Sequence, residues 1–382
     1  MSSSRAFKRL EWLFSRLGVV CQIVGAFVLM LIAGNYLLGG AAFVYNLVQT
    51  GETGKVDLRY RSPVYDGDPE RIAYWKEFEK AWATHFEPYL HWKRDEFHGR
   101  FINVDREGIR RTVKDGVRPG STKVFMFGGS TLWGTGAPDS KTIPSYVQAL
   151  LGPDYDVYNF GETGYVAAQE LNALLLLLAQ GRRPGVVIFY DGVNDGYAGT
   201  YSPAIPRDPH NLRMRDKADR SLAAELLSRS KYRKFLELVL GDRMYASWER
   251  KIAPSIDEHS IATIGFYEAH IKQVKALAQA YGFEACFFWQ PNLFSLTRTH
   301  LTPWEKNTIE KASTTLLASQ QAVYEVARQR LSGRQDENIF FLGNIFDGVK
   351  APVYVDWHHV GPNGNRIIAE AMVRSCRLHR DF

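Results

Sequence analysis

The chain has few cysteines. Only Cys21, Cys286 and Cys376 occur among its 382 residues. They form no Cys-x-x-Cys pair and have no histidine at ligand spacing, so the sequence predicts neither a structural zinc site nor a disulfide framework. A Cys286–Cys376 bridge remains open, but buried free thiols are the favoured interpretation. The sequence also lacks internal repeats and low-complexity tracts.

A strong excess of one charge is missing too. The formal net charge is +6, from 47 basic and 41 acidic residues that are interspersed along the chain. No stripe alternates basic and aromatic residues, so we expect no nucleic-acid partner. An apolar content of 45% is that of an ordinary globular protein, and the length suits a membrane anchor plus one large domain.

One long apolar run lies near the N-terminus, over residues 19–45. At about 1.5 Å per residue, the roughly 26 residues from Val19 to Val44 reach about 39 Å, enough for a tilted crossing of a hydrocarbon core of ~30 Å. Ala41-Ala42 has the small residues of a signal-peptide cleavage site, but a cleaved signal has an apolar region of only about 7–15 residues. The run therefore predicts an uncleaved transmembrane anchor.

Basic residues on either side of this run predict its orientation. Residues 1–18 carry four of them and form the expected cytoplasmic tail, whereas three follow the run before residue 62. By the positive-inside rule, this modest bias places the rest of the chain outside the cytoplasm.

Residues 46–118 form an aromatic and charged lead-in, which we expect to pack on the main domain. Within it, apolar residues recur at helical spacing over 70–85, and 100–112 has a more extended pattern. The main domain is expected over 119–382. It includes residues 197–260, a proline-containing and basic insertion near the site whose role as a lid stays open.

The main domain alternates apolar strand patterns with helical patterns. The expected strands are Lys123–Phe127, Asp156–Phe160, Gly185–Tyr190, Phe283–Trp289 and Asn338–Leu342. Such alternation predicts a parallel, doubly wound sheet with helices on both faces. The expected fold is therefore a three-layer α/β/α arrangement with a five-stranded sheet in flavodoxin-like order.

Polar groups follow three of these strands, at the edge where open α/β sheets place their sites. Ser130 ends a Gly-Gly-Ser turn, and its hydroxyl would be a nucleophile if a base took its proton. Gly164 offers a backbone N–H with no side chain in the way, and Asn194 offers a side-chain amide. With the Ser130 N–H, these groups could form an oxyanion hole.

A base with an orienting carboxylate comes near the C-terminus, in Asp356-Trp-His-His359. At this spacing the Asp356 carboxylate can reach the imidazole of His359 and fix its tautomer, which leaves Nε2 to deprotonate Ser130. His358 points about a third of a turn away and has a supporting role. These groups are those that an acyl-ester hydrolase needs.

Each block also has a plainer interpretation. Ser130 could be a helix N-cap, Gly164 a turn glycine and Asn194 a capping residue. Asp356 and His359 could make a structural contact, or join His358 around a metal, although no further ligand cluster supports one. Gln290-Pro291 and Asp195 could line the pocket. A strand-end turn is the better interpretation for Gln290-Pro291, and a capping role for Asp195. All four blocks occur in a fixed order after the expected strands, and this combination favours a catalytic site over four separate structural roles.

The four blocks resemble those of the SGNH/GDSL esterase–lipase superfamily. The carried-over residues are Ser130, Gly164, Asn194, and Asp356 with His359, and the Gly-Pro-Asn-Gly-Asn run after His359 is similar as well. The resemblance covers roughly residues 120–378. One departure is Gly129, which replaces the usual Asp of Gly-Asp-Ser. Phe-Gly-Gly-Ser-Thr resembles a membrane-associated bacterial branch linked to envelope polysaccharides.

This resemblance implies a serine esterase that removes an acyl group, in particular acetyl, from a carbohydrate or envelope lipid without a cofactor or metal. It also implies a single-pass protein of the bacterial inner membrane with a periplasmic catalytic domain, near proteins of polysaccharide biosynthesis. Two alternatives stay open: an O-acyltransferase that uses the same tetrad, and a catalytically silent subunit of an envelope assembly.

Overall fold

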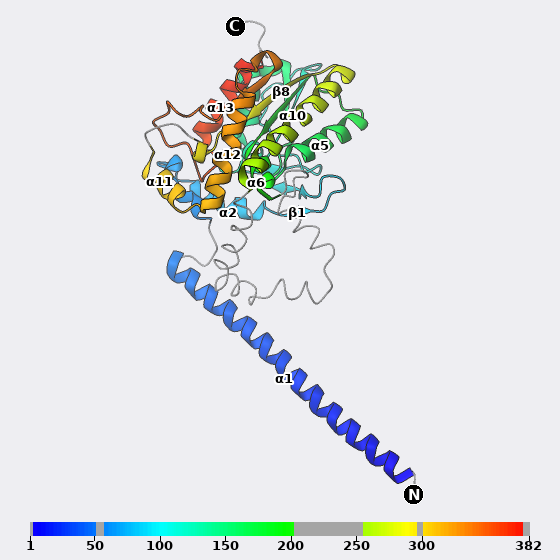
Figure 1. Ribbon diagram of the computed structural model, residues 1–382. Helices are drawn as coiled ribbons and strands as arrows, with labels where there is room; N and C mark the ends of the chain where they lie inside the picture. The colour runs from blue at the N-terminus through cyan, green and yellow to red at the C-terminus, as the bar shows by residue number, and fades with distance from the viewer. Residues whose placement is uncertain (1–2, 51–56, 202–254, 296–300, 377–382) are drawn as a thin grey trace. The chain divides into compact units, whose positions relative to one another are not determined.

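The computed structural model describes residues 3–50, 57–201, 255–295 and 301–376. They divide into two units, and helix α1 (Ser3–Thr50) belongs to the first (Figure 1). All other described residues belong to the second unit, which carries the predicted site.

Helix α1 contains the predicted span. An 18-residue window within Arg16–Ala41 has a mean hydropathy of 2.4, and this stretch is long and apolar enough to cross a membrane once. This stretch begins three residues before the start of the predicted run of 19–45 and ends four residues before the end of that run. The helix continues without a break through residues 3–18, where the sequence contains no proline and only one glycine, Gly18, to interrupt it.

The second unit is built on a five-stranded parallel sheet in the order β6-β5-β7-β8-β9. Numbered along the chain, this is the predicted flavodoxin-like order, and the α/β fold class is confirmed. The strands are β5 (Thr122–Gly128), β6 (Tyr155–Asn159), β7 (Val186–Asp191), β8 (Glu284–Trp289) and β9 (Ile339–Phe341). Each lies within two residues of its predicted bounds.

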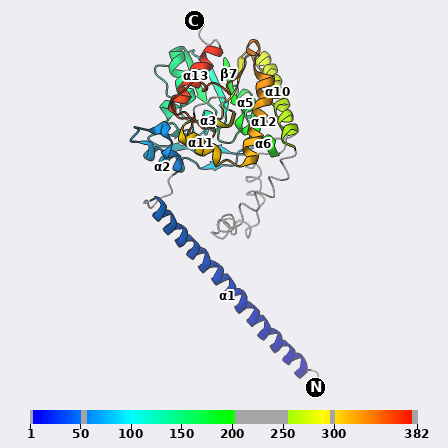
Figure 2. The same cartoon turned by 60° about the vertical axis from the view of Figure 1, so that its left-hand side comes forward.

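Alternate side chains of β5 point to opposite faces of the sheet. Val124 and Met126 pack with α4 (Ile143–Leu151) and α13 (Pro362–Ser375), whereas Phe125 and Phe127 face the opposite layer. That layer is formed by α5 (Ala167–Ala179), α10 (Ile256–Tyr281) and α12 (Thr314–Leu331). The two views show helices on both sides of the sheet (Figures 1 and 2). The short helices are α3 (Ser130–Trp133), α6 (Val193–Tyr201) and α11 (Pro303–Glu310).

The lead-in contains less helix than the sequence predicts. Its helix α2 covers only Arg71–Lys80 of the expected 70–85, because the chain then turns back into the hairpin of β1 (Thr84–His85) and β2 (Lys93–Arg94). The other lead-in elements are η1 (Leu58–Arg61), η2 (Pro63–Tyr65), β3 (Phe97–His98) and β4 (Asn103–Val104). Aromatic residues of α2 and η2 pack against Trp133 and Val355, so the lead-in lies against two of the predicted blocks.

The predicted insertion has helical ends. Residues 197–201 belong to α6 and residues 256–260 to α10. The rest of it, including the question of a lid, lies outside the described residues.

The expectation of two buried free thiols is wrong. Cys286 on β8 and Cys376 at the end of α13 form a disulfide, with their Cα atoms 6.2 Å apart. The bridge forms because α13 packs on the face of the sheet to which Cys286 points. Sequence spacing alone does not show that a strand and a helix 90 residues apart will meet there.

We therefore expect one free thiol per chain, that of Cys21, when the purified full-length protein is titrated with a thiol reagent in denaturant. Reduction should lower the free energy of unfolding by about 2–4 kcal/mol, because the bridge restricts the unfolded chain. The Cys286→Ser variant should show the same loss without reductant. Three reactive thiols before reduction would contradict the bridge.

Candidate active site

Ser130 lies directly after the central strand β5. Gly129 is the extended N-cap of α3, and Ser130 begins that short helix. Gly128 allows the close approach of the neighbouring strand, since a Cβ there would lie 2.7 Å from the carbonyl oxygen of Tyr190. The Ser130 side chain is thereby held at the carboxyl edge of the sheet, with 8% of the residue exposed.

Asp356 and His359 lie on one tight turn, which a hydrogen bond from the Val355 N–H to the His359 carbonyl closes at 2.8 Å. Asp356 Oδ1 accepts the backbone N–H groups of His358 and His359 at 3.0 and 2.8 Å. Asp356 Oδ2 lies 2.6 Å from His359 Nδ1. The turn therefore fixes the carboxylate and the imidazole together.

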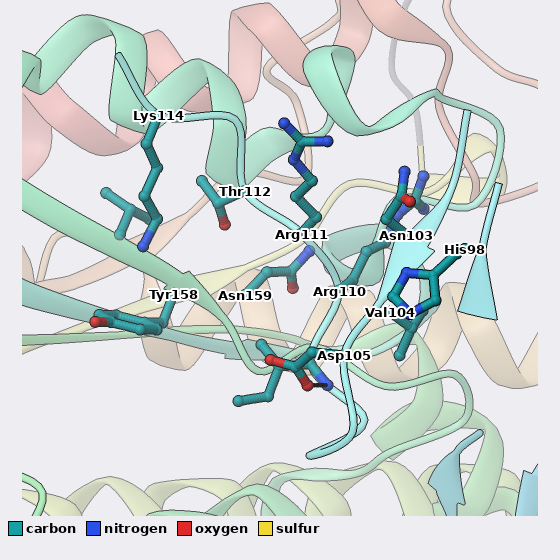
Figure 3. A pocket seen from close by; sticks show the side chains of 12 residues that line it. His98, Asn103, Val104, Asp105, Arg110, Arg111, Thr112, Lys114, Tyr158 and Asn159 are labelled. Carbon is teal, nitrogen blue, oxygen red and sulfur yellow. Dashed lines mark hydrogen bonds between the residues drawn. The ribbon is translucent and has the colours of Figure 1, made fainter. Parts of the chain in front are cut away.

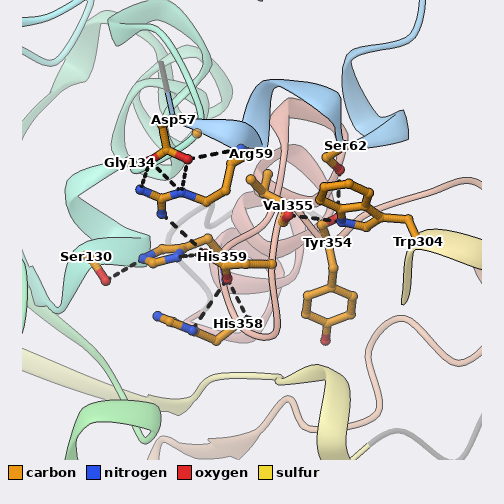
Figure 4. A network of polar contacts seen from close by, with 12 residues as sticks. Asp57, Arg59, Ser62, Ser130, Gly134, Trp304, Tyr354, Val355, His358 and His359 are labelled. Atoms are coloured by element: carbon orange, nitrogen blue, oxygen red, sulfur yellow. Dashed lines mark hydrogen bonds and ion pairs between the residues drawn. The ribbon is translucent and has the colours of Figure 1, made fainter. Parts of the chain in front are cut away.

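The structure brings this turn to Ser130. His359 Nε2 lies 2.7 Å from Ser130 Oγ, although 229 residues separate them (Figure 4). The hydroxyl, the imidazole and the carboxylate thus form one continuous hydrogen-bonded line. Only 7% of His359 is exposed, so the line is largely shielded from solvent.

The charges around this line favour an ionised Asp356. Burial opposes ionisation, but the neighbouring imidazole of His359, its hydrogen bond and the positive charge of Arg59 together hold the pKa of Asp356 well below its ordinary value. Burial lowers the pKa of His358 to about 3, so that this side chain is neutral. The His358 ring lies against that of His359, with 3.8 Å between centroids, which agrees with a supporting role.

Gly164 and Asn194 lie beside each other near this line. Gly164 has a φ of +80°, which glycine adopts without strain, in a turn where the Tyr165 N–H donates to the Glu162 carbonyl at 3.2 Å. Asn194 Nδ2 donates to the Tyr165 carbonyl at 2.8 Å. An amide nitrogen carries two hydrogens, so this bond leaves Asn194 one further donor.

The same geometry explains the departure at Gly129. A Cβ at this position would lie 2.3 Å from Asn194 Nδ2. The Asn194 amide therefore occupies the space that the Cβ atom of any other residue at position 129 would need. The position of Asn194 therefore requires glycine at residue 129, where the family usually has Asp.

Two buried arginines of the lead-in hold the loops that carry Ser130 and Gly164. Arg110 donates to the Trp133, Gly134 and Ala137 carbonyls at 2.7–3.1 Å and to Asp139 at 3.0 Å. Arg94 donates to Glu162 and Thr163 side chains at 2.7 and 2.6 Å. The sequence pattern indicates neither residue as part of a site, because arginines in a charged lead-in look like ordinary surface residues.

Behind Asn194, three carboxyl groups are buried together. Glu170, Asp191 and Asp195 are each at most 7% exposed. Burial raises the pKa of all three, and the charge of the neighbouring carboxylates adds to the rise for Glu170 and Asp191. Asp195 Oδ1 also accepts the Ala167 N–H at 3.0 Å, so it caps α5 as the sequence suggested. Gln290 is buried, and its N–H donates to the Asp191 carbonyl at 2.7 Å.

Among the described residues, Asp356, His358 and His359 form a group whose ligand atoms lie within 4.8 Å of one another, close enough for a metal ion. Both oxygens of Asp356 and both ring nitrogens of His359 are already engaged in hydrogen bonds. A metal would have to break the line to Ser130, so the donor set fits a proton relay better.

Two pockets of about 380 Å³ each lie away from this line. One lies between the lead-in and strand β6, with Arg111, Lys114 and Tyr158 among its lining residues (Figure 3). The other lies between the lead-in and α5 and includes Glu162 and Tyr165. Neither is lined by Ser130 or His359.

This chain is similar to known proteins in its structure but not in its sequence. No family model matches the chain, and no curated protein matches its sequence. Similar solved structures include a lipolytic protein of the G-D-S-L family from Desulfitobacterium hafniense, at 14% identity and a TM-score of 0.36. A carbohydrate acetylesterase family member from Sinorhizobium meliloti matches at 13% and 0.37, and an acetylxylan esterase from Geobacillus stearothermophilus at 16% and 0.35.

Each of these matches covers 67% of this chain and between 95% and 99% of the other. The first of them is named for the G-D-S-L family, which the four blocks resemble. Because every TM-score lies below 0.5, the functional conclusion rests on the geometry of the site.

The buried carboxyl cluster predicts how stability changes with pH. Since the pKa of Asp191 is raised, the folded state holds a proton that the unfolded state releases above about pH 4, and stability falls as the pH rises towards the folded value. The Asp191→Asn variant removes this cost, so its Tm advantage over the wild type should grow between pH 5 and pH 8. A change of 1 kcal/mol would move Tm by roughly 2–4 °C. A pH-independent difference would show that Asp191 is ionised in the folded protein.

Proposed function

We propose that this protein is a serine esterase that hydrolyses acyl esters through an acyl-serine intermediate. The observation that carries the proposal is the unbroken line from Ser130 Oγ to His359 and Asp356, with contacts of 2.7 and 2.6 Å. Ser130 Oγ attacks the ester carbonyl carbon as its proton passes to His359 Nε2. The imidazolium then gives this proton to the leaving alcohol, and a water molecule, deprotonated in the same way, releases the acid.

The developing oxyanion needs donors near Ser130. We assign this role to the backbone N–H groups of Ser130 and Gly164 and to the Asn194 amide. Supporting this, Asn194 lies against Gly129, the residue before Ser130, and is hydrogen-bonded to Tyr165, the residue after Gly164. Asp356 stabilises the imidazolium through the carboxylate that its lowered pKa keeps ionised.

A small acyl group, acetyl, suits the enclosure of Ser130 and His359, each less than a tenth exposed. The candidate span in α1 and the Cys286–Cys376 bridge support an anchored protein whose second unit folds in an oxidising compartment. We therefore propose the bacterial inner membrane, a periplasmic catalytic unit and an acylated carbohydrate or envelope lipid as substrate. Proteins of polysaccharide biosynthesis are the proposed neighbours.

The two alternatives receive less support. A silent assembly subunit has no need of an aligned nucleophile, base and carboxylate. An O-acyltransferase would use the same line, but no contact of the described residues favours a sugar hydroxyl over water as the acceptor. Hydrolysis is therefore the proposal.

The first test removes the members of the line in turn. Ser130→Ala and His359→Ala should lower kcat for p-nitrophenyl acetate by about 10³-fold or more, because each removes an essential step of the transfer. His358→Ala, the matched control on the same turn, should stay within about tenfold of the wild type. A fluorophosphonate should label Ser130 in the wild type, and full activity in Ser130→Ala would refute the assignment.

The second test concerns the oxyanion donors. Asn194→Ala should lower kcat by about 10²–10³-fold. Gly129→Ala should lower it in the same way, because the new Cβ displaces the Asn194 amide while a φ of −77° accepts alanine without strain.

The double variant should be no worse than Asn194→Ala alone, since both changes remove one interaction. Gly265→Ala is the control, because a Cβ there would meet only the Arg330 side chain, at an ordinary contact distance of 3.9 Å. Additive losses for Gly129→Ala and Asn194→Ala would show that the two residues act separately.

A further inference from the structure

Arg59 connects the lead-in to the catalytic carboxylate. It lies in η1, the first described element of the second unit. Its Nη1 donates to Asp356 Oδ2 at 3.3 Å, the same oxygen that faces His359 Nδ1 (Figure 4). A guanidinium group from the lead-in therefore shares its acceptor with the imidazole.

Arg59 is held firmly by a second carboxylate. Its Nη2 lies 2.6 Å from Asp57 Oδ2, and its Nε donates to Asp57 at 3.0 Å. The guanidinium also lies over the Trp75 ring, 4.5 Å from the centroid. Burial opposes the charge, but the hydrogen bond with Asp57 and the charges of both carboxylates raise the pKa of Arg59, so it stays protonated.

The charges in this arrangement alternate along a chain: Asp57, Arg59, Asp356 and then the imidazole of His359. The Arg59 charge favours the ionised carboxylate but opposes a second positive charge on the imidazole. Asp57 offsets part of the Arg59 charge. Arg59 should therefore lower the basicity of the imidazole, and Asp57 should raise it.

We infer that the Asp57–Arg59 pair is a positioning device that sets the basicity of the Ser130–His359–Asp356 line from outside the main domain. The inference rests on the proposed esterase function. It gives the lead-in a role in the reaction, although neither residue touches the nucleophile.

Three other titratable groups near Asp356 and Arg59 are neutral. Tyr65 of η2 and Tyr74 of α2 are buried, and burial raises the pKa of each. His358, on the same turn as His359, is neutral because burial lowers its pKa. Among the described residues that interact with Asp356 and Arg59, Asp57 is thus the remaining charge that offsets Arg59.

The test is the pH dependence of kcat/KM for p-nitrophenyl acetate, measured on the full-length protein in detergent. Arg59→Met should move the acid limb to higher pH by about half a unit to one unit, because a positive charge near the imidazole is lost. Asp57→Asn should move it to lower pH, because the Arg59 charge is then less offset. The Asp57→Asn/Arg59→Met double variant should return close to the wild type.

Two further variants separate this effect from damage to the fold. Arg59→Lys keeps the charge and should restore most of the wild-type profile. Arg61→Met, in the same element but with an exposed side chain on Tyr60, should leave it unchanged. Thermal unfolding identifies any variant that is misfolded.

Shifts of equal sign in Arg59→Met and Asp57→Asn, or no shift in either, would overturn the inference while Ser130 still reacts with the fluorophosphonate. Absence of labelling in the wild type would instead count against the proposed esterase. The two failures are therefore distinguishable.

Discussion

The contact between His359 Nε2 and Ser130 Oγ, 2.7 Å long, is the interaction on which the proposed chemistry depends. It exists because two loops that are 229 residues apart in the sequence meet at the carboxyl edge of one parallel sheet. The β5 loop is fixed by α3 and the Arg110 hydrogen bonds, and the Asp356 turn is closed by its own backbone. A small displacement of either would break the path of the proton, since a hydrogen bond tolerates little change in length.

Buried arginine is the means by which the lead-in joins the site. Arg94, Arg110 and Arg59 each contact a different block, and the side chains of Arg94 and Arg110 are fully buried. Such groups are kept in an interior only where carbonyls or carboxylates compensate for lost hydration. Their donors hold the segments that follow β5 and β6 and the turn of Asp356. The lead-in is thus part of the site rather than a linker to it.

Two groups of carboxyls in this unit have opposite electrostatic surroundings. Asp356 faces imidazoles and a guanidinium, so its pKa is lowered and its contribution to stability is lost as the pH falls below its ordinary value. Burial raises the pKa values of Glu170, Asp191 and Asp195, and the neighbouring carboxylates add to the rise for Glu170 and Asp191, so these groups oppose stability as the pH rises. The same residue type therefore has its place in the proposed catalytic line at one position and limits the pH range of the fold at the other.

The sequence by itself determined the fold class, the strand order, the apolar span and the residues that meet at Ser130, because strand–helix alternation and strand-end polar groups are local patterns. It overestimated the helix of the lead-in, since the hairpin at Thr84 is stabilised by pairing with Lys93–Arg94 rather than by local spacing. Only the tertiary structure decided that Cys286 and Cys376 bond, that Gly129 makes room for Asn194 and that Arg59 reaches Asp356. Each of these contacts joins residues that are distant in the sequence, and a local sequence pattern does not show which distant residues will meet.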